Sequence, residues 1–381
     1  MQRLKIALLL IMLIITVSCR NDKDVELFND VKSLGVSSPF TIATIYDDSI
    51  VMPYPNIELL NEEQGLNYTL SFIRLDGNRR YMNSNPSNKC NSGKLTECSG
   101  YRESLIQATL FFKNKLVLIE DKFEASTFTN YTTISTVDID GSNLFEIDRS
   151  EEQATRNNLI ALGDNKIYYS LSNNILIEYD YDKNSKTVIT NDNDSIRDVS
   201  TIFFESGKLY IHARLYDDGV EVVNYPILSY ENNGFKVVAN NVQGHVTHIN
   251  EDFYVVDPSN TSNNKSSHIV YYDGDKKEYS QNFFASIGTV KYKDYLIINY
   301  LEEKEDKLFT KIKLYKIKNG KVKYLDEITS DETYYINAVS NNVIALTYGE
   351  KISDEIPTLG IFPAYTSIEN DKLKSITKIK K

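Results

Sequence analysis

The sequence predicts an all-β fold, a seven-bladed β-propeller of four-stranded antiparallel blades. Three observations support this prediction. The same pattern occurs seven times: an apolar run, a tight polar turn and a second apolar run. A second hairpin with its own polar turn follows each copy. The apolar anchors of the seven copies lie 66, 51, 42, 44, 43 and 47 residues apart, and four-stranded units of roughly 40–50 residues are typical of propeller blades.

Each predicted blade consists of two hairpins, because short runs of Ile, Val, Tyr and Phe are bounded by Asp, Asn, Gly and Ser. A solenoid would have shorter repeats, and a sandwich would not repeat one four-strand pattern seven times. We expect the last blade to contain all four of its strands without an N-terminal strand. The seven predicted blades span about 38–83, 104–150, 157–191, 198–241, 244–283, 286–329 and 333–379.

The third repeat carries two tyrosine-rich segments, 166–169 (Lys-Ile-Tyr-Tyr) and 179–182 (Tyr-Asp-Tyr-Asp). Their layout resembles that of YWTD-like bacterial propellers, well in this blade and loosely in the others. The resemblance implies the propeller fold and carries no catalytic motif. The chain has no Trp, which excludes the tryptophan motif of quinone-type propellers.

The N-terminus has the pattern of a secretory signal. Arg3 and Lys5 precede an unbroken apolar run, 6–15, and small residues lead to Cys19. The apolar run is shorter than the roughly 20 residues that span a bilayer. The ending, 16–19, resembles the lipobox of bacterial lipoproteins, with Thr16 where leucine is usual.

That resemblance implies that residues 1–18 are removed and that Cys19 receives a fatty-acid anchor. Residues 19–37 would then form the tether. The resemblance also implies a lipid-anchored protein of the bacterial cell envelope, on the periplasmic or surface side of the outer membrane in a Gram-negative organism. The alternative is ordinary cleavage that leaves a free thiol at Cys19.

Two further cysteines, Cys90 and Cys98, predict a disulfide, since an exported chain reaches an oxidising compartment. The segment between them is short, polar and rich in turn residues, so its ends meet easily. Zinc would need more ligands nearby than the sequence offers. A bridge over so short a loop contributes about 2.5 kcal/mol in the chain-entropy model.

The chain is acidic, which argues against nucleic acid as a partner. Loss of Arg3 and Lys5 with the signal takes the net charge from −11 to −13. We expect the longer connections to lie on one face of the ring, opposite the tight turns. These connections span 55–66, 120–130, 216–221, 257–267, 302–307 and 349–358. Together with the disulfide stretch 84–103, the six connections carry a net charge of −11.

The acidic face predicts a protein partner with a basic patch, or divalent ions; alternatively, the loops are tolerated surface insertions. Four acidic residues of one loop are candidates for contacting such a partner. The starts of the inner strands would lie near the mouth of the central channel, where five more candidates either line a ligand pocket or pair with neighbouring acids. The candidates are Glu302, Glu303, Glu305 and Asp306, then Arg102, Arg156, Arg197, His245 and Tyr334.

No cofactor is expected. Asp192, Asp194 and Asp198 could nevertheless hold a structural calcium ion between the third and fourth blades, since Ca²⁺ binds carboxylate oxygens. His245 and His248 resemble a metal-binding pair, but simple strand alternation places them on opposite faces. We therefore expect structural roles for the histidines.

The sequence favours a binding or assembly platform held to a membrane by its lipid. The alternative is a propeller enzyme, a hydrolase or lyase acting on glycans or peptides, with its site at the channel mouth on the long-loop face. Convergent acids or His–acid pairs in a deep central pocket would favour the enzyme.

Overall fold

A computed structural model of the 381-residue chain gives the fold. It describes sixteen stretches, and all statements about structure below concern these residues. The stretches are 42–55, 68–82, 101–124, 129–150, 159–172, 175–190, 195–217, 220–222, 225–242, 244–257, 266–271, 281–282, 285–304, 307–318, 321–351 and 359–379.

The described strands pair into seven separate sheets, each built from consecutive strands. The first three sheets are β1(Thr44–Tyr46)–β2(Ser49–Pro55)–β3(Tyr68–Arg74)–β4(Arg79–Tyr81), β5(Tyr101–Phe112)–β6(Lys115–Glu124)–β7(Thr129–Asp138)–β8(Phe145–Ser150), and β9(Leu159–Leu162)–β10(Lys166–Ser172)–β11(Ile175–Asp180)–β12(Ser185–Thr190).

The next two sheets are β13(Ile196–Glu205)–β14(Lys208–Asp217)–β16(Ile227–Glu231)–β17(Gly234–Ala239), with β15(Val220–Val222) beside β14, and β18(His245–Ile249)–β19(Phe253–Asp257)–β20(Ser266–Tyr271)–β21(Gln281–Asn282). The last two are β22(Ala285–Tyr292)–β23(Tyr295–Lys304)–β24(Lys307–Lys318)–β25(Lys321–Ser330) and β26(Tyr334–Ser340)–β27(Val343–Lys351)–β28(Leu359–Glu369)–β29(Lys372–Leu373), with β30(Thr377–Lys378) beside β28.

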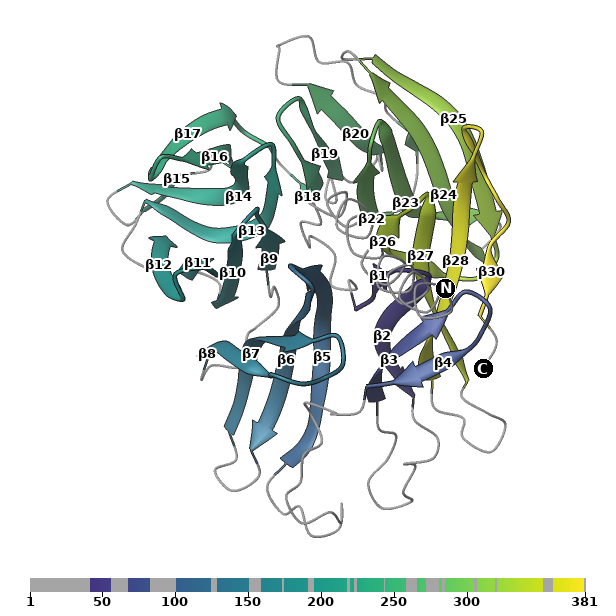
Figure 1. The fold of residues 1–381 in the computed structure, drawn as a ribbon. Coiled ribbons are helices and arrows are strands. Elements are labelled where there is room, and N and C mark those ends of the chain that lie inside the picture. The colour runs from purple at the N-terminus through teal and green to yellow at the C-terminus, as the bar shows by residue number, and fades with distance from the viewer. Residues whose placement is uncertain are drawn as a thin grey trace, which may run out of the picture.

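The sheets are arranged around a common centre. Figure 1 shows the first strand of each sheet nearest the centre and the last strands at the periphery. All strand pairs are antiparallel, and every first strand is joined to its second by a tight turn. The chain is thus an all-β propeller with four-stranded antiparallel blades, as the sequence predicts.

The tight turns follow from their residues. Lys113 and Asn114 both have positive φ angles, 47° and 61°, and so do Asn341 and Asn342, 50° and 63°. Two left-handed residues in a row define a type I′ turn, whose twist matches that of the flanking strands. Asn adopts this conformation more readily than most residues. We call this end of the blades the tight-turn end.

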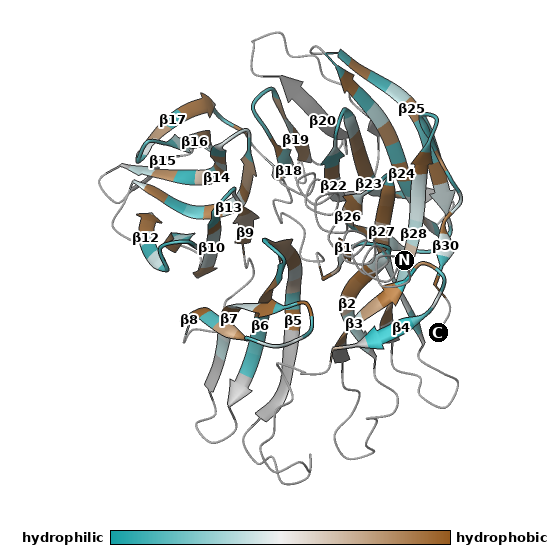
Figure 2. Cartoon of the chain, viewed as in Figure 1, coloured by the Kyte–Doolittle hydropathy of each residue, from teal (hydrophilic) through white to brown (hydrophobic). Residues whose placement is uncertain are grey.

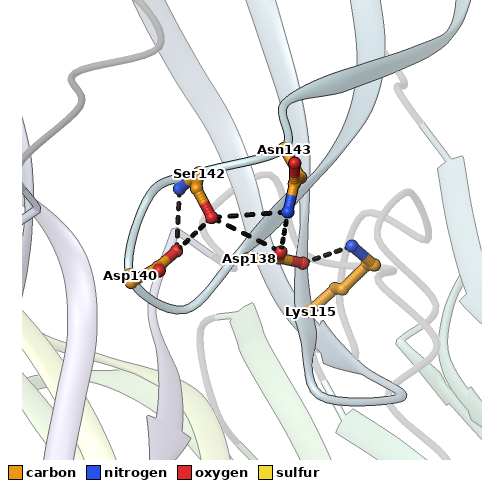
Figure 3. A network of polar contacts seen from close by, with 5 residues as sticks. All are labelled: Lys115, Asp138, Asp140, Ser142 and Asn143. Carbon is orange, nitrogen blue, oxygen red and sulfur yellow. Dashed lines mark hydrogen bonds and ion pairs between the residues drawn. The ribbon is translucent and has the colours of Figure 1, made fainter.

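The turn between β7 and β8 shows how such a turn is held (Figure 3). Asp140 accepts hydrogen bonds from the backbone N–H and the hydroxyl of Ser142, at 2.8 and 2.6 Å. Asp138 pairs with Lys115 and accepts from the Asn143 amide at 2.6 Å. The bond from Lys115 lowers the pKa of Asp138, and the bonds from Ser142 lower the pKa of Asp140. These acids serve the turn itself.

The core consists of apolar layers between neighbouring sheets. Figure 2 shows apolar residues along the inner strands and polar residues toward the periphery, for example on β4. The largest cluster packs the last sheet against the sixth and the first. Its fully or almost fully buried members include Ile45, Met52, Ile312, Leu314, Ile336, Leu346 and Phe362.

A side-chain amide joins the first and last sheets. Asn337 on β26 accepts hydrogen bonds from the backbone N–H groups of Ile42 and Ala43, at 3.1 and 3.3 Å. Its own amide group donates to the Tyr335 carbonyl and the Thr347 hydroxyl, both at 2.9 Å. Among the described strands, none from the N-terminal part pairs with the last sheet.

Several expected loops are strands instead. The ladder between β6 and β7 continues to Glu124 and Thr129, and that between β23 and β24 continues to Lys304 and Lys307. Much of 120–130 and of 302–307 is therefore regular hairpin, which corrects the expectation of irregular loops.

The expected loop 216–221 is also a hairpin, in which Tyr216 pairs with Glu221. The ladder between β27 and β28 likewise extends to Lys351 and Leu359. These charged stretches suggested loops because charged residues are typical of surface connections, whereas the ladders show that they form strands. We call the end of the blades at which these extended hairpins lie, opposite the tight-turn end, the long-hairpin end.

Some expectations fall outside the described residues. These are the signal and anchor at Cys19, the pair Cys90 and Cys98, most of the connections 55–66, 84–103 and 257–267, and the acids Asp192 and Asp194. In the described part of the chain, no helix is long and apolar enough to cross a membrane.

Candidate functional site

The inner strand of the fourth sheet is distorted at the long-hairpin end. Arg197 on β13 pairs with Arg214 on β14, but the next pair is Thr201 with His212. Three residues of β13 thus lie opposite one residue of β14, which makes a large β-bulge. Within it Asp198 has a φ of 49°. Bulges are frequent beside functional sites, where they re-aim side chains, and left-handed residues other than glycine concentrate there.

Two tyrosines support the two arginines. The Arg197 guanidinium lies 4.8 Å from the centre of the Tyr216 ring, and that of Arg214 lies 5.4 Å from the centre of the Tyr225 ring. The Tyr216 hydroxyl donates to Asp198 at 2.7 Å. The same carboxylate oxygen is 3.9 Å from an Arg214 nitrogen. One network therefore links both arginines through Tyr216 and Asp198.

His212 fixes the floor beneath this network. It is buried, and its Nε2 donates to the Val242 carbonyl at 3.0 Å, which leaves Nδ1 to accept from the Ser200 hydroxyl at 2.7 Å. The Val242 N–H in turn donates to the Tyr225 carbonyl at 2.8 Å. Both ring nitrogens of His212 are therefore engaged in holding the bulge and the Tyr225 segment in place, as expected for a structural histidine.

Of the predicted candidates, Arg197 is the one found in this cluster. Tyr334 is buried in the cluster that packs the last sheet against the sixth and the first, and its hydroxyl donates to Glu332 at 2.6 Å. Glu302 pairs with Lys311 at 2.9 Å. His245, Arg102 and Glu303 belong to β18, β5 and β23, but their side chains lie outside the described set, as do Arg156, Glu305 and Asp306 entirely.

Regular alternation does not hold along the strand that carries His245 and His248. The register of β18 shifts between Val246 and His248, so His245 pairs with Asp257 and His248 with Val255. The side chains of His245 and Asp257 lie outside the described set, and the placement of the two histidines on opposite faces stays a prediction. A bulge of this kind cannot be recognised from strand periodicity.

A second polar cluster lies at the tight-turn end and joins three sheets. Glu205 of β13 pairs with Lys291 of β22, and its other carboxylate oxygen is 4.0 Å from Nε2 of His248 on β18. That oxygen is buried and has no hydrogen-bond partner. Burial raises the pKa of Glu205 and lowers the pKa of His248 to about 3. His248 is thus neutral at physiological pH.

Sequence reasoning missed Asp198 as a partner of the arginines, and it missed Arg214, Tyr216, Glu205 and Lys291 altogether. No signal in the sequence pairs the two arginines, because Arg197 lies nine residues before the turn at 206–207 and Arg214 lies seven residues after it, and the bulge makes up the difference. Asp198, one of the three acids that could hold calcium, accepts from Tyr216, and Asp192 and Asp194 lie outside the described residues. In the described residues, no three His, Cys, Asp or Glu side chains come together as a metal site would require.

No protein-family model and no curated protein matches the sequence. Solved structures do. The acylaminoacyl peptidase of Pyrococcus horikoshii is 9% identical with a TM-score of 0.50, over 88% of this chain and 51% of that one, so this chain spans about half of the peptidase.

Two further matches are 10% identical, each with a TM-score of 0.46. The β-propeller domain of the trilobed protease of Pyrococcus furiosus aligns over 89% of this chain and 94% of that one. An oligogalacturonate lyase in complex with manganese aligns over 70% and 74%. At such identities the likeness concerns the fold alone, and this chain is similar to β-propellers.

Proposed function

We propose that this chain is a lipid-anchored β-propeller of the bacterial cell envelope, with seven blades, that serves as a binding or assembly platform. Its partner carries a basic patch and docks on the long-hairpin end. The observation that supports this proposal best is that ladders such as those of β6–β7 and β23–β24 continue into stretches rich in charged residues at that end. Hairpins held by regular ladders present a more rigid surface than irregular loops.

The charge distribution supports a cationic partner. The connections expected at this end carry nearly all of the net negative charge of the chain. Charge complementarity acts mainly on the rate of encounter, and salt weakens it as the Debye length falls to about 8 Å at physiological ionic strength. The structural roles of His212 and His248 favour a platform over the alternative of an enzyme.

The test begins with cross-linking in the native envelope and identification of the captured partner. Association is then measured for a variant in which Glu303, Glu305 and Asp306 are changed to lysine. Glu302 is left intact because it pairs with Lys311. We expect a slower association rate, a smaller change in dissociation rate and a weaker dependence on salt.

The matched control changes Asp273 and Asp275, in a predicted turn of the opposite end, to lysine, and should leave association unchanged. Equal effects of both variants, or an acidic captured partner, would refute docking at the long-hairpin end.

A further inference from the structure

Two arginines face each other across neighbouring strands, which is unusual in a sheet. Arg197 and Arg214 are a register pair on β13 and β14. Residues in such pairs have Cβ atoms about 4.5–5.5 Å apart, and like charges directly opposite each other destabilise a sheet. A binding role would account for keeping both charges at this position.

The surrounding contacts hold this pair in place. Each guanidinium stacks on a tyrosine ring, and Asp198, Tyr216 and Arg214 are linked. The Tyr216 N–H donates to the Ser195 carbonyl at 2.8 Å, which ties the start of β13 to the end of β14 on one side of the bulge. The Arg214 side chain remains 41% exposed and that of Asp198 36% exposed. The cluster is thus preorganised and open to solvent.

We propose that Arg197 and Arg214 form a binding site for an oxyanion, the carboxylate or phosphate group of a small ligand. A guanidinium has five N–H donors in a planar fork that matches such groups. Two guanidiniums on rigid strands therefore hold one oxyanion from two directions. Asp198 keeps the Arg214 side of the site oriented and acts as a positioning residue. This site does not depend on the docking of a basic partner.

The experiment uses the full mature chain at constant ionic strength, set with sodium chloride. Inorganic phosphate and D-glucuronate are titrated separately by calorimetry, so that the two sources of an oxyanion are distinguished. We expect saturable binding of at least one of them. Arg197→Gln and Arg214→Gln should each weaken it at least tenfold, which corresponds to about 1.4 kcal/mol.

The matched control is Arg149→Gln. Arg149 on β8 also stacks on a tyrosine, 4.4 Å from the Tyr131 ring centre, and pairs with Glu146, but it belongs to another blade. Its loss should leave binding unchanged. The double variant R197K/R214K keeps both charges without the forks, and it should bind weakly while keeping the wild-type far-ultraviolet circular dichroism.

No saturable binding by the wild type, binding that survives both glutamine substitutions, or an equal loss in R149Q would overturn the proposal. Docking of the basic partner is measured in parallel on R214Q. An unchanged association rate there separates the fate of this site from that of the proposed platform.

Discussion

The burial of ionisable side chains makes the free energy of unfolding of this propeller depend on pH, and His248 is the clearest case. Burial lowers its pKa from the ordinary 6.5 to about 3. Below pH 6.5 the unfolded chain binds a proton at this residue and the folded chain does not. The free energy of unfolding therefore falls as the pH falls from 6.5 toward 3, by up to about 1.4 kcal/mol per pH unit from this residue. The raised pKa of Glu205 acts in the opposite sense, because the folded state takes up that proton first.

His248→Phe tests the assignment. The ring contacts of His248 with Phe203 and Phe253 favour an aromatic replacement. Urea unfolding between pH 7 and pH 4 should show a shallower loss of stability in the variant than in the wild type. A difference between the two proteins that stays constant over this range would contradict the assignment.

At the scale of single strands, β6 contains an ion pair inside the blade. Glu120 is fully buried, its carboxylate oxygens have no hydrogen-bond partner, and Lys122 lies 3.3 Å from it with 16% of its side chain exposed. Removal of one member of a buried pair leaves an uncompensated charge, whereas replacement of both by apolar residues is often neutral or stabilising.

We expect Lys122→Met to lower the free energy of unfolding by about 3–5 kcal/mol, and the double variant E120M/K122M to be at least as stable as the wild type. Denaturant unfolding at neutral pH measures both. A double variant that is less stable than K122M would show that Glu120 has a role other than that of an ion-pair partner.

The sequence predicts the central parts of such strands but not their ends. The central parts of the strands were predictable because their apolar runs end in Asn, Asp and Gly turns. The strand ends at the long-hairpin end were not, since Glu302–Lys307 has the composition of a loop and only the ladder reveals the hairpin. The sequence predicted that Arg197 lies at the start of an inner strand, but it did not predict which residues surround it. The bulge that brings Asp198 to Tyr216 and Arg214 depends on contacts across strands, which periodicity does not encode.

At the scale of the whole molecule, the contact between the first and last sheets is the part of the fold that the sequence specifies least. The sequence predicts the four-stranded antiparallel blades, and the structure confirms them; that seven of them close one ring stays a prediction. The role of Asn337 could not be predicted, because its backbone partners Ile42 and Ala43 are nearly 300 residues away.

Asn337→Ala should reduce the free energy of unfolding by about 2–4 kcal/mol, because it leaves buried N–H and hydroxyl groups without partners. Limited proteolysis should cut the first sheet, 44–81, before the others. Asn299→Ala is the control, since Asn299 donates to the Tyr334 carbonyl between the sixth and seventh sheets at 2.7 Å. Equal protection of the first sheet in both variants would contradict a closing role for Asn337.

The construction of each sheet from one continuous stretch also has a consequence for the speed of folding. Nearly every strand pair has low contact order, and such pairings form quickly. The contact of Asn337 with Ile42 closes a loop of 295 residues, and the entropy of closure grows only with the logarithm of loop length. Blades can therefore form one after another as the chain is synthesised, and the contact between the first and last sheets must await the last of them.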